Sequence, residues 1–101
     1  MPFDTTGVVA LNRGLLIRRL RDPSTKQSWN FTYPYKCAMS VASEICPGWT
    51  NRTFGLSNWQ VITLFGVFNA WFYRRLFRSQ VTSDMVADAL ERASYHRVDN
   101  R

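Results

Sequence analysis

Few residues in this chain are of the types that carry out catalysis or bind metals. His96 is the only histidine, and the cysteines are Cys37 and Cys46. A Cys37–His96 pair would combine a nucleophile with a base, but nothing in the spacing of these residues favours it. The chain has no CxxC motif, so zinc binding is not expected. The sequence therefore predicts no catalytic residue, no metal and no cofactor.

The two cysteines leave a choice open. If both lie on one helix, their nine-residue separation places them about 13 Å apart along the axis, on opposite faces. A disulfide would then be excluded by distance, whereas a looped segment would allow one. The simpler interpretation is that they are two ordinary thiols.

The acidic residues also lack the arrangement of an active site. Asp84, Asp88 and Glu91 fall on what we expect to be the solvated face of a helix. The chain has no glycine-rich phosphate loop and no paired carboxylates in an apolar setting. These observations favour a protein that acts by binding and is not an enzyme.

The charge indicates which partners are compatible with the chain. Thirteen basic residues against seven acidic ones give a formal net charge of +6 over 101 residues. Eleven of the basic residues are arginines, whose planar fork binds phosphate and carboxylate groups bidentately. Anionic phospholipid, nucleic acid and an acidic protein surface are therefore all candidate partners.

These residues must be positioned by a fold that the sequence predicts to be mainly α. Residues 7–21 are expected to form a basic N-terminal helix that ends at Asp22-Pro23, because the residue before proline avoids the helical region. Residues 23–28 read as a turn or linker. The aromatic residues of 29–35 alternate strictly and favour an extended segment, which Pro34 confines to a sheet edge.

Two further helices are expected on either side of the most apolar stretch. Residues 37–46 read as a short helix that stops at a Pro-Gly pair, followed by a loop over 49–57. Residues 78–101 contain an amphipathic helix and a tail, with Thr82 or Ser83 as the N-cap. The predicted apolar face of this helix consists of Met85, Val86, Ala89, Leu90 and Ala93.

The stretch between these helices predicts a transmembrane helix. Residues 59–73 carry no charge, and extension to 56–77 gives about 33 Å of helix, enough to cross the hydrocarbon core. Residues 1–57 and 78–101 would then lie outside the membrane. The alternative is a buried core helix of a small soluble domain. The interfacial aromatics would be Trp59 and Trp71, and the lipid headgroup contacts Arg74, Arg75 and Arg78.

One face of this helix is predicted to pack against another helix. Its residues are small or polar, and Gly66 and Ala70 form a small-xxx-small pattern that lets two helix backbones approach closely. The arginines after the span place the C-terminus on the cytoplasmic or matrix side. The packing face consists of Thr63, Gly66, Asn69, Ala70 and Tyr73.

Three stretches of the chain resemble cytochrome c oxidase subunit VIc. They are "RGLLIRRLR" at 13–21, "LFGVFNAWFYRRLF" at 64–77 and "ERASYHRVD" at 91–99. The resemblance implies a non-catalytic, single-pass accessory subunit of a mitochondrial inner-membrane complex of the respiratory chain. Such a subunit supports assembly and stability by packing against larger membrane-protein subunits and anionic phospholipid. The charge rule puts the C-terminus of this chain on the matrix side, opposite to the orientation that the family suggests.

A different class of function is the alternative. The chain could be a small soluble basic module that binds nucleic acid or protein. Alternating aromatics beside basic residues are typical of stacking platforms for single-stranded nucleic acid. The simpler interpretation of the same aromatics is a half-buried edge strand or a cover for a neighbouring subunit.

Overall fold

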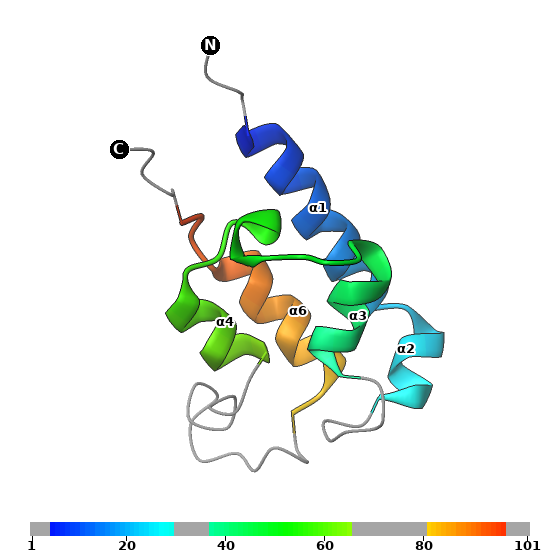
Figure 1. Ribbon diagram of the computed structural model, residues 1–101. Coiled ribbons are helices and arrows are strands. Elements are labelled where there is room, and N and C mark those ends of the chain that lie inside the picture. Colours follow the sequence, from blue (N-terminus) through cyan, green and yellow to red (C-terminus); the bar gives the residue numbers. More distant parts are fainter. Residues whose placement is uncertain (1–4, 30–36, 66–80, 97–101) are drawn as a thin grey trace.

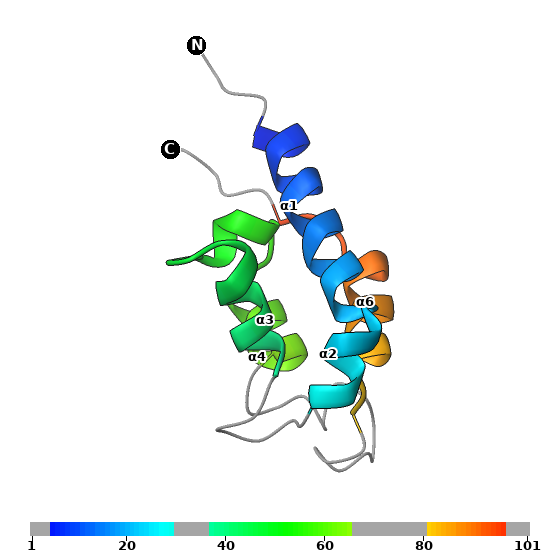
Figure 2. The same ribbon diagram turned by 90° about the vertical axis from the view of Figure 1, so that its right-hand side faces the viewer.

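The computed structural model describes residues 5–29, 37–65 and 81–96 of the chain. These ranges are mainly helical (Figure 1). The longest helix, α1, contacts α2, α3, η1 and α6, and α3 lies beside α4 (Figure 2). In chain order the elements are α1 Thr5–Leu20, α2 Pro23–Ser28, α3 Ala38–Ile45, the 3-10 helix η1 Asn51–Phe54, α4 Asn58–Phe65 and α6 Ser83–Arg92.

The Asp22-Pro23 pair both ends α1 and begins α2. The Asp22 carboxylate accepts hydrogen bonds from the amide of Ser24 at 2.9 Å and from its hydroxyl at 2.7 Å. Pro23 occupies the first turn, where its missing N–H costs nothing. The prediction of a turn or linker over 23–28 is therefore wrong, because an N-cap aspartate followed by proline is a helix start.

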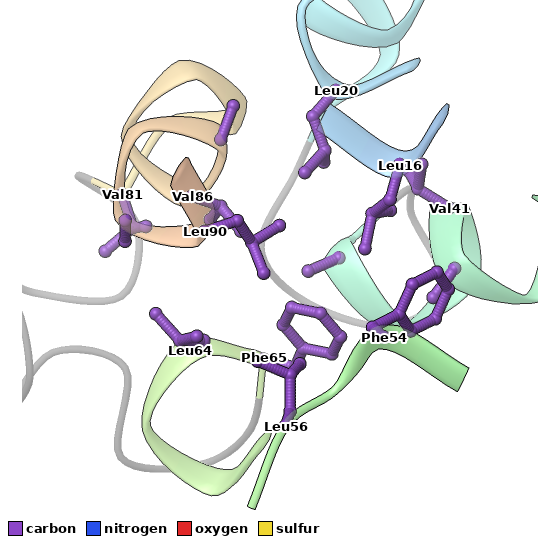
Figure 3. Packing of buried hydrophobic residues seen from close by; sticks show 14 residues of the cluster. Leu16, Leu20, Val41, Phe54, Leu56, Leu64, Phe65, Val81, Val86 and Leu90 are labelled. Atoms are coloured by element: carbon purple, nitrogen blue, oxygen red, sulfur yellow. The ribbon is translucent and has the colours of Figure 1, made fainter. Parts of the chain in front are cut away.

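The buried side chains of the described helices form one core. Figure 3 shows side chains from α1, α3, α4 and α6 converging on it, including Leu16, Phe65 and Leu90. The Trp49 ring, between α3 and η1, packs edge-on against Phe65 at a centroid distance of 5.6 Å. Val86, Ala89 and Leu90 are buried, and they lie on the face of α6 that the sequence predicts to be apolar.

The apolar stretch after Ser57 begins as a core helix, and the predicted transmembrane helix over 56–77 is wrong. A reciprocal cap opens α4: the Gln60 amide donates to Ser57 Oγ at 3.1 Å, and the Ser57 amide donates to Gln60 Oε1 at 2.7 Å. Leu64 and Phe65 are buried in the protein core. Within residues 5–29, 37–65 and 81–96, no helix is long and apolar enough to cross a membrane.

The structure also bears on three features predicted from the sequence: the aromatic segment, the two cysteines and the N-cap of α6. Of the aromatic segment 29–35, the described residue is Trp29, whose indole Nε1 donates to the Val81 carbonyl at 2.8 Å. Cys37 and Cys46 flank α3 at its two ends, and both are free thiols. The caps of α6 include Thr82, whose Oγ1 accepts from the Met85 amide at 3.2 Å.

A buried arginine joins α1 to two other elements. Arg13 is 2% exposed, and its guanidinium donates to the carbonyls of Phe54 at 2.9 Å and Gly55 at 2.9 Å. The same group donates to Leu90 at 3.3 Å and Ala93 at 2.6 Å. These carbonyls lie at the C-terminal ends of η1 and α6, where helix carbonyls lack intrahelical partners and a cation is favoured.

An aromatic ring lies against the same guanidinium. The centre of the Arg13 guanidinium lies 3.8 Å from the centroid of the Tyr95 ring, within the range of a cation–π contact. Burial lowers the pKa of Arg13 from its usual value, although an arginine stays charged under all ordinary conditions. The charge is therefore compensated by four carbonyl dipoles and one ring.

Gly55 lies directly beneath this contact and has no room for a side chain. Its φ is 66°, in the left-handed region. A Cβ at this position would lie 2.6 Å from Val9 Cγ1 and 2.8 Å from Tyr95 Cδ1. Gly48 has a similar φ of 74°, but a Cβ there would meet nothing within 4 Å.

Replacement of Arg13 tests the carbonyl anchor. We expect Arg13→Met to lower the free energy of unfolding by about 3 kcal/mol, because buried carbonyls lose their donors. Arg13→Lys should also destabilise, because one ammonium cannot reproduce the fork. Urea unfolding measures both changes. Arg18→Met, on the exposed side of α1, is the control and should change stability by less than about 0.5 kcal/mol; equal effects at both positions would contradict the anchor.

The two left-handed glycines form a second matched pair. Gly48→Ala should cost about 1 kcal/mol from backbone strain alone. Gly55→Ala should cost about 1–3 kcal/mol more, because its methyl group must displace Val9 and Tyr95. Thermal unfolding of both variants checks the difference, and an equal loss would show that the close packing around Gly55 does not exist.

Candidate interaction surface

Most residues of the predicted helix-packing and lipid-contact sites lie outside the described residues. Thr63 lies in α4, and Trp59 on the same helix is 56% exposed. The packing face and the headgroup contacts therefore stay predictions. The sites outside the described residues are Gly66, Asn69, Ala70, Trp71, Tyr73, Arg74, Arg75 and Arg78.

Among the described residues, no group of three metal-ligating side chains lies together. His96 is exposed, and its backbone amide donates to the Gly55 carbonyl at 2.8 Å. Cys37 is the N-cap of α3, where its amide donates to Ser40 Oγ at 2.8 Å. The backbone amides of both residues thus form hydrogen bonds that stabilise the local structure, and these contacts point to no chemical role for either side chain.

Several basic side chains are engaged in ion pairs with the protein's own carboxylates. Arg21, just after α1, donates to Asp88 at 2.7 Å and to Glu91 at 2.7 Å. Lys26 of α2 lies 2.8 Å from Asp84 of α6. Hydrogen bonds to Glu91 and Asp88 raise the pKa of Arg21 above its ordinary value. This charge cluster attaches the C-terminal end of α1 to the outer face of α6.

The opposite side of α1 carries an apolar row that the described protein leaves uncovered. Val8, Leu11 and Leu15 are 61%, 64% and 40% exposed. They recur at i, i+3 and i+7, so they lie along one face of the helix, which we call the α1 stripe. In both views the first turns of α1 extend past the other labelled helices (Figures 1 and 2).

The α1 stripe continues toward basic residues. Arg18, one turn after Leu15, is exposed and pairs with no carboxylate of the described residues. The whole of α1 contains three arginines and no acidic residue. The sequence signal for the stripe is its spacing, and it was missed because leucines on the buried face interrupt the pattern.

A groove adjoins the C-terminal end of the stripe, between α1 and α3. Its volume is about 330 Å³. Leu15 and Ile45 supply its apolar lining, and its charged lining consists of Arg18, Arg19, Asp22 and Glu44. Across it, Arg19 Nη1 lies 3.4 Å from Glu44 Oε2, with both side chains more than a third exposed.

The Asp84 carboxylate gives the charge cluster a testable pH dependence. Its hydrogen bond with Lys26 lowers its pKa below the ordinary value. A depressed native pKa contributes stability that is present above the unfolded pKa and is lost as pH falls through the native pKa. We therefore expect the melting temperature of the protein to fall on acidification below about pH 4, and to fall less for Asp84→Asn.

Lys26→Met provides the matched comparison for this prediction. It removes the largest cause of the Asp84 shift and should flatten the same part of the melting curve against pH. Differential scanning calorimetry across the acidic range measures all three proteins. Identical acid dependence in all of them would contradict a stabilising Lys26–Asp84 pair.

Comparison with known proteins finds no match to this chain among family models, curated proteins or solved structures. The resemblance to cytochrome c oxidase subunit VIc therefore stays a prediction from the three sequence stretches. The interaction surface is defined by the geometry of α1 alone.

Proposed function

We propose that the protein is a non-catalytic interaction module that binds an acidic partner protein through the α1 stripe. The observation that carries this proposal is the exposure of Val8, Leu11 and Leu15 on a helix without a single acidic residue. A contiguous apolar row on a protein surface marks an interaction site more often than scattered apolar residues do.

The spacing of the stripe suits a groove on another protein. Partner proteins recognise helices through anchors at i, i+3, i+4 and i+7 that enter an apolar groove. The buried face of α1 holds it against its own core, so its exposed side, which carries the stripe, remains available for binding. Arg18, at the end of the row, favours carboxylates at the rim of the partner groove.

A second copy of this chain is a poor occupant of the stripe. Two α1 helices packed together would bring only arginines of like charge to the contact, since α1 has no carboxylate to pair with them. Like charges across an interface oppose association. The charge of α1 therefore favours a different, acidic protein.

Nucleic acid and membrane surfaces match the described surface less well. Arg13 is buried, and Arg19, Arg21 and Lys26 form ion pairs with the protein's own carboxylates, so much of the described positive charge is compensated. Exposed valine and leucine add nothing to phosphate binding. A helix that lies on a membrane places basic residues on a solvated face, whereas the face of α1 opposite the stripe is in the protein core.

A role as an accessory subunit of a larger complex remains compatible with this surface. It requires a face that packs on another subunit, and it requires no membrane span. The assignment to the mitochondrial inner membrane and the respiratory chain is a prediction from sequence.

Site-specific photo-crosslinking tests the proposal. A photoreactive amino acid at position 8, 11 or 15 should link the protein to the same segment of one partner protein, and that segment should be apolar with neighbouring acidic residues. Leu11→Asp should weaken the association by about 2 kcal/mol, the loss expected for an interface hot spot. Mass spectrometry and co-purification read out both results.

The control position is Gln27, exposed on α2. A probe there should not yield the same crosslink, and Leu11→Asp should leave the circular dichroism spectrum and melting temperature unchanged. Crosslinks to lipid, to nucleic acid or to a second copy of the chain would overturn the proposal, as would crosslinking no stronger than at position 27.

A further inference from the structure

The lining of the groove between α1 and α3 includes two carboxylates: Asp22, which caps α2, and Glu44, which is in loose contact with Arg19. Arg19 lies 3.4 Å from Glu44, whereas Arg21 lies 2.7 Å from each of Asp88 and Glu91. Charge-assisted hydrogen bonds between arginine and carboxylate are normally about 2.7–2.9 Å long. The Arg19–Glu44 contact is also exposed, and such pairs contribute little to stability.

The groove combines this contact with apolar lining and a second arginine. Leu15 belongs both to the α1 stripe and to the groove, so the two surfaces are continuous. Arg18 adds a guanidinium that pairs with no carboxylate of the described chain. A segment that covers the stripe therefore leads directly into a pocket with two arginines.

We propose that this groove is the binding site for an aspartate or glutamate side chain of the partner, with Glu44 as an internal competitor. This inference rests on the proposed function, because the carboxylate belongs to the segment that covers the stripe. The incoming carboxylate takes hydrogen bonds from Arg18 and Arg19, and Glu44 is released to solvent. The groove of about 330 Å³ has room for one such side chain beside Leu15 and Ile45.

If Glu44 competes with the partner carboxylate, its removal should raise the affinity for the partner. A purely structural ion pair predicts no such gain. Removal of the Glu44 charge frees Arg19, so Glu44→Gln should strengthen binding to an acidic partner. Arg18→Gln removes one of the two donors and should weaken it. Arg92→Gln, on the exposed face of α6, removes the same charge elsewhere and is the matched control.

The test uses a synthetic amphipathic helical peptide with leucines along one face and a glutamate one turn beyond the last leucine. A second peptide carries glutamine at that position. Fluorescence anisotropy measures the affinity of the full chain and its variants for both. We expect the glutamate peptide to bind roughly threefold more tightly than the glutamine peptide, the size of one exposed ion pair.

The variants separate the site from general charge effects. Glu44→Gln should strengthen glutamate-peptide binding by roughly threefold and leave glutamine-peptide binding unchanged. Arg18→Gln should reduce the difference between the peptides, because Arg19 remains as a donor, and Arg92→Gln should preserve the full difference. Thermal unfolding confirms that each exposed substitution leaves the fold intact.

Two failures are distinguishable. If both peptides bind equally, weaken with Leu11→Asp and ignore Glu44→Gln, the groove does not bind a carboxylate, although the stripe still binds the apolar face. If neither peptide binds the wild-type chain, the stripe does not recognise an apolar helix, and the proposed function falls together with the groove.

Discussion

The fold depends on one buried guanidinium that is paired with carbonyls and has no carboxylate beside it. Arg13 donates to four backbone oxygens at the ends of η1 and α6, and Tyr95 lies over its face. A single side chain thereby supplies donors to carbonyls at two helix ends, where carbonyls commonly lack intrahelical partners. Because the fork is rigid, it fixes the rotation of α1 about its axis. That rotation determines which side chains of α1 are buried and which form the stripe.

Opposite surfaces of α1 consequently have different roles. Leu16 and Leu20 enter the core on the side of Arg13, while Arg21 joins the helix to the carboxylates of α6. The side that remains carries Leu11 and its neighbours into solvent. The carboxylates of α6 are thus paired within the described chain, whereas the stripe on α1 is left uncovered.

Sequence patterns over a few residues predicted some helices and the N-cap of α6 correctly. They could not predict contacts between residues that are far apart in the sequence. The periodicity and cap of α6 predicted its buried face, because both depend on residues a few positions apart. The Asp22-Pro23 pair was interpreted only as a stop, although it also begins α2. The lack of charge after Ser57 suggested lipid, but Leu64 and Phe65 are buried by distant segments instead. Nothing around Arg13 in the sequence indicates that its partners are backbone carbonyls about forty and eighty positions away.

The long sequence separation of that contact has a consequence for how the chain is made. Arg13 is synthesised 80 residues before Ala93, so the anchor cannot close until at least that length of chain has been made. Until then α1 displays its future core face and its stripe at once, as a basic, apolar helix without a counterpart. During this interval, chaperones that bind exposed apolar segments have access to residues that the folded protein buries.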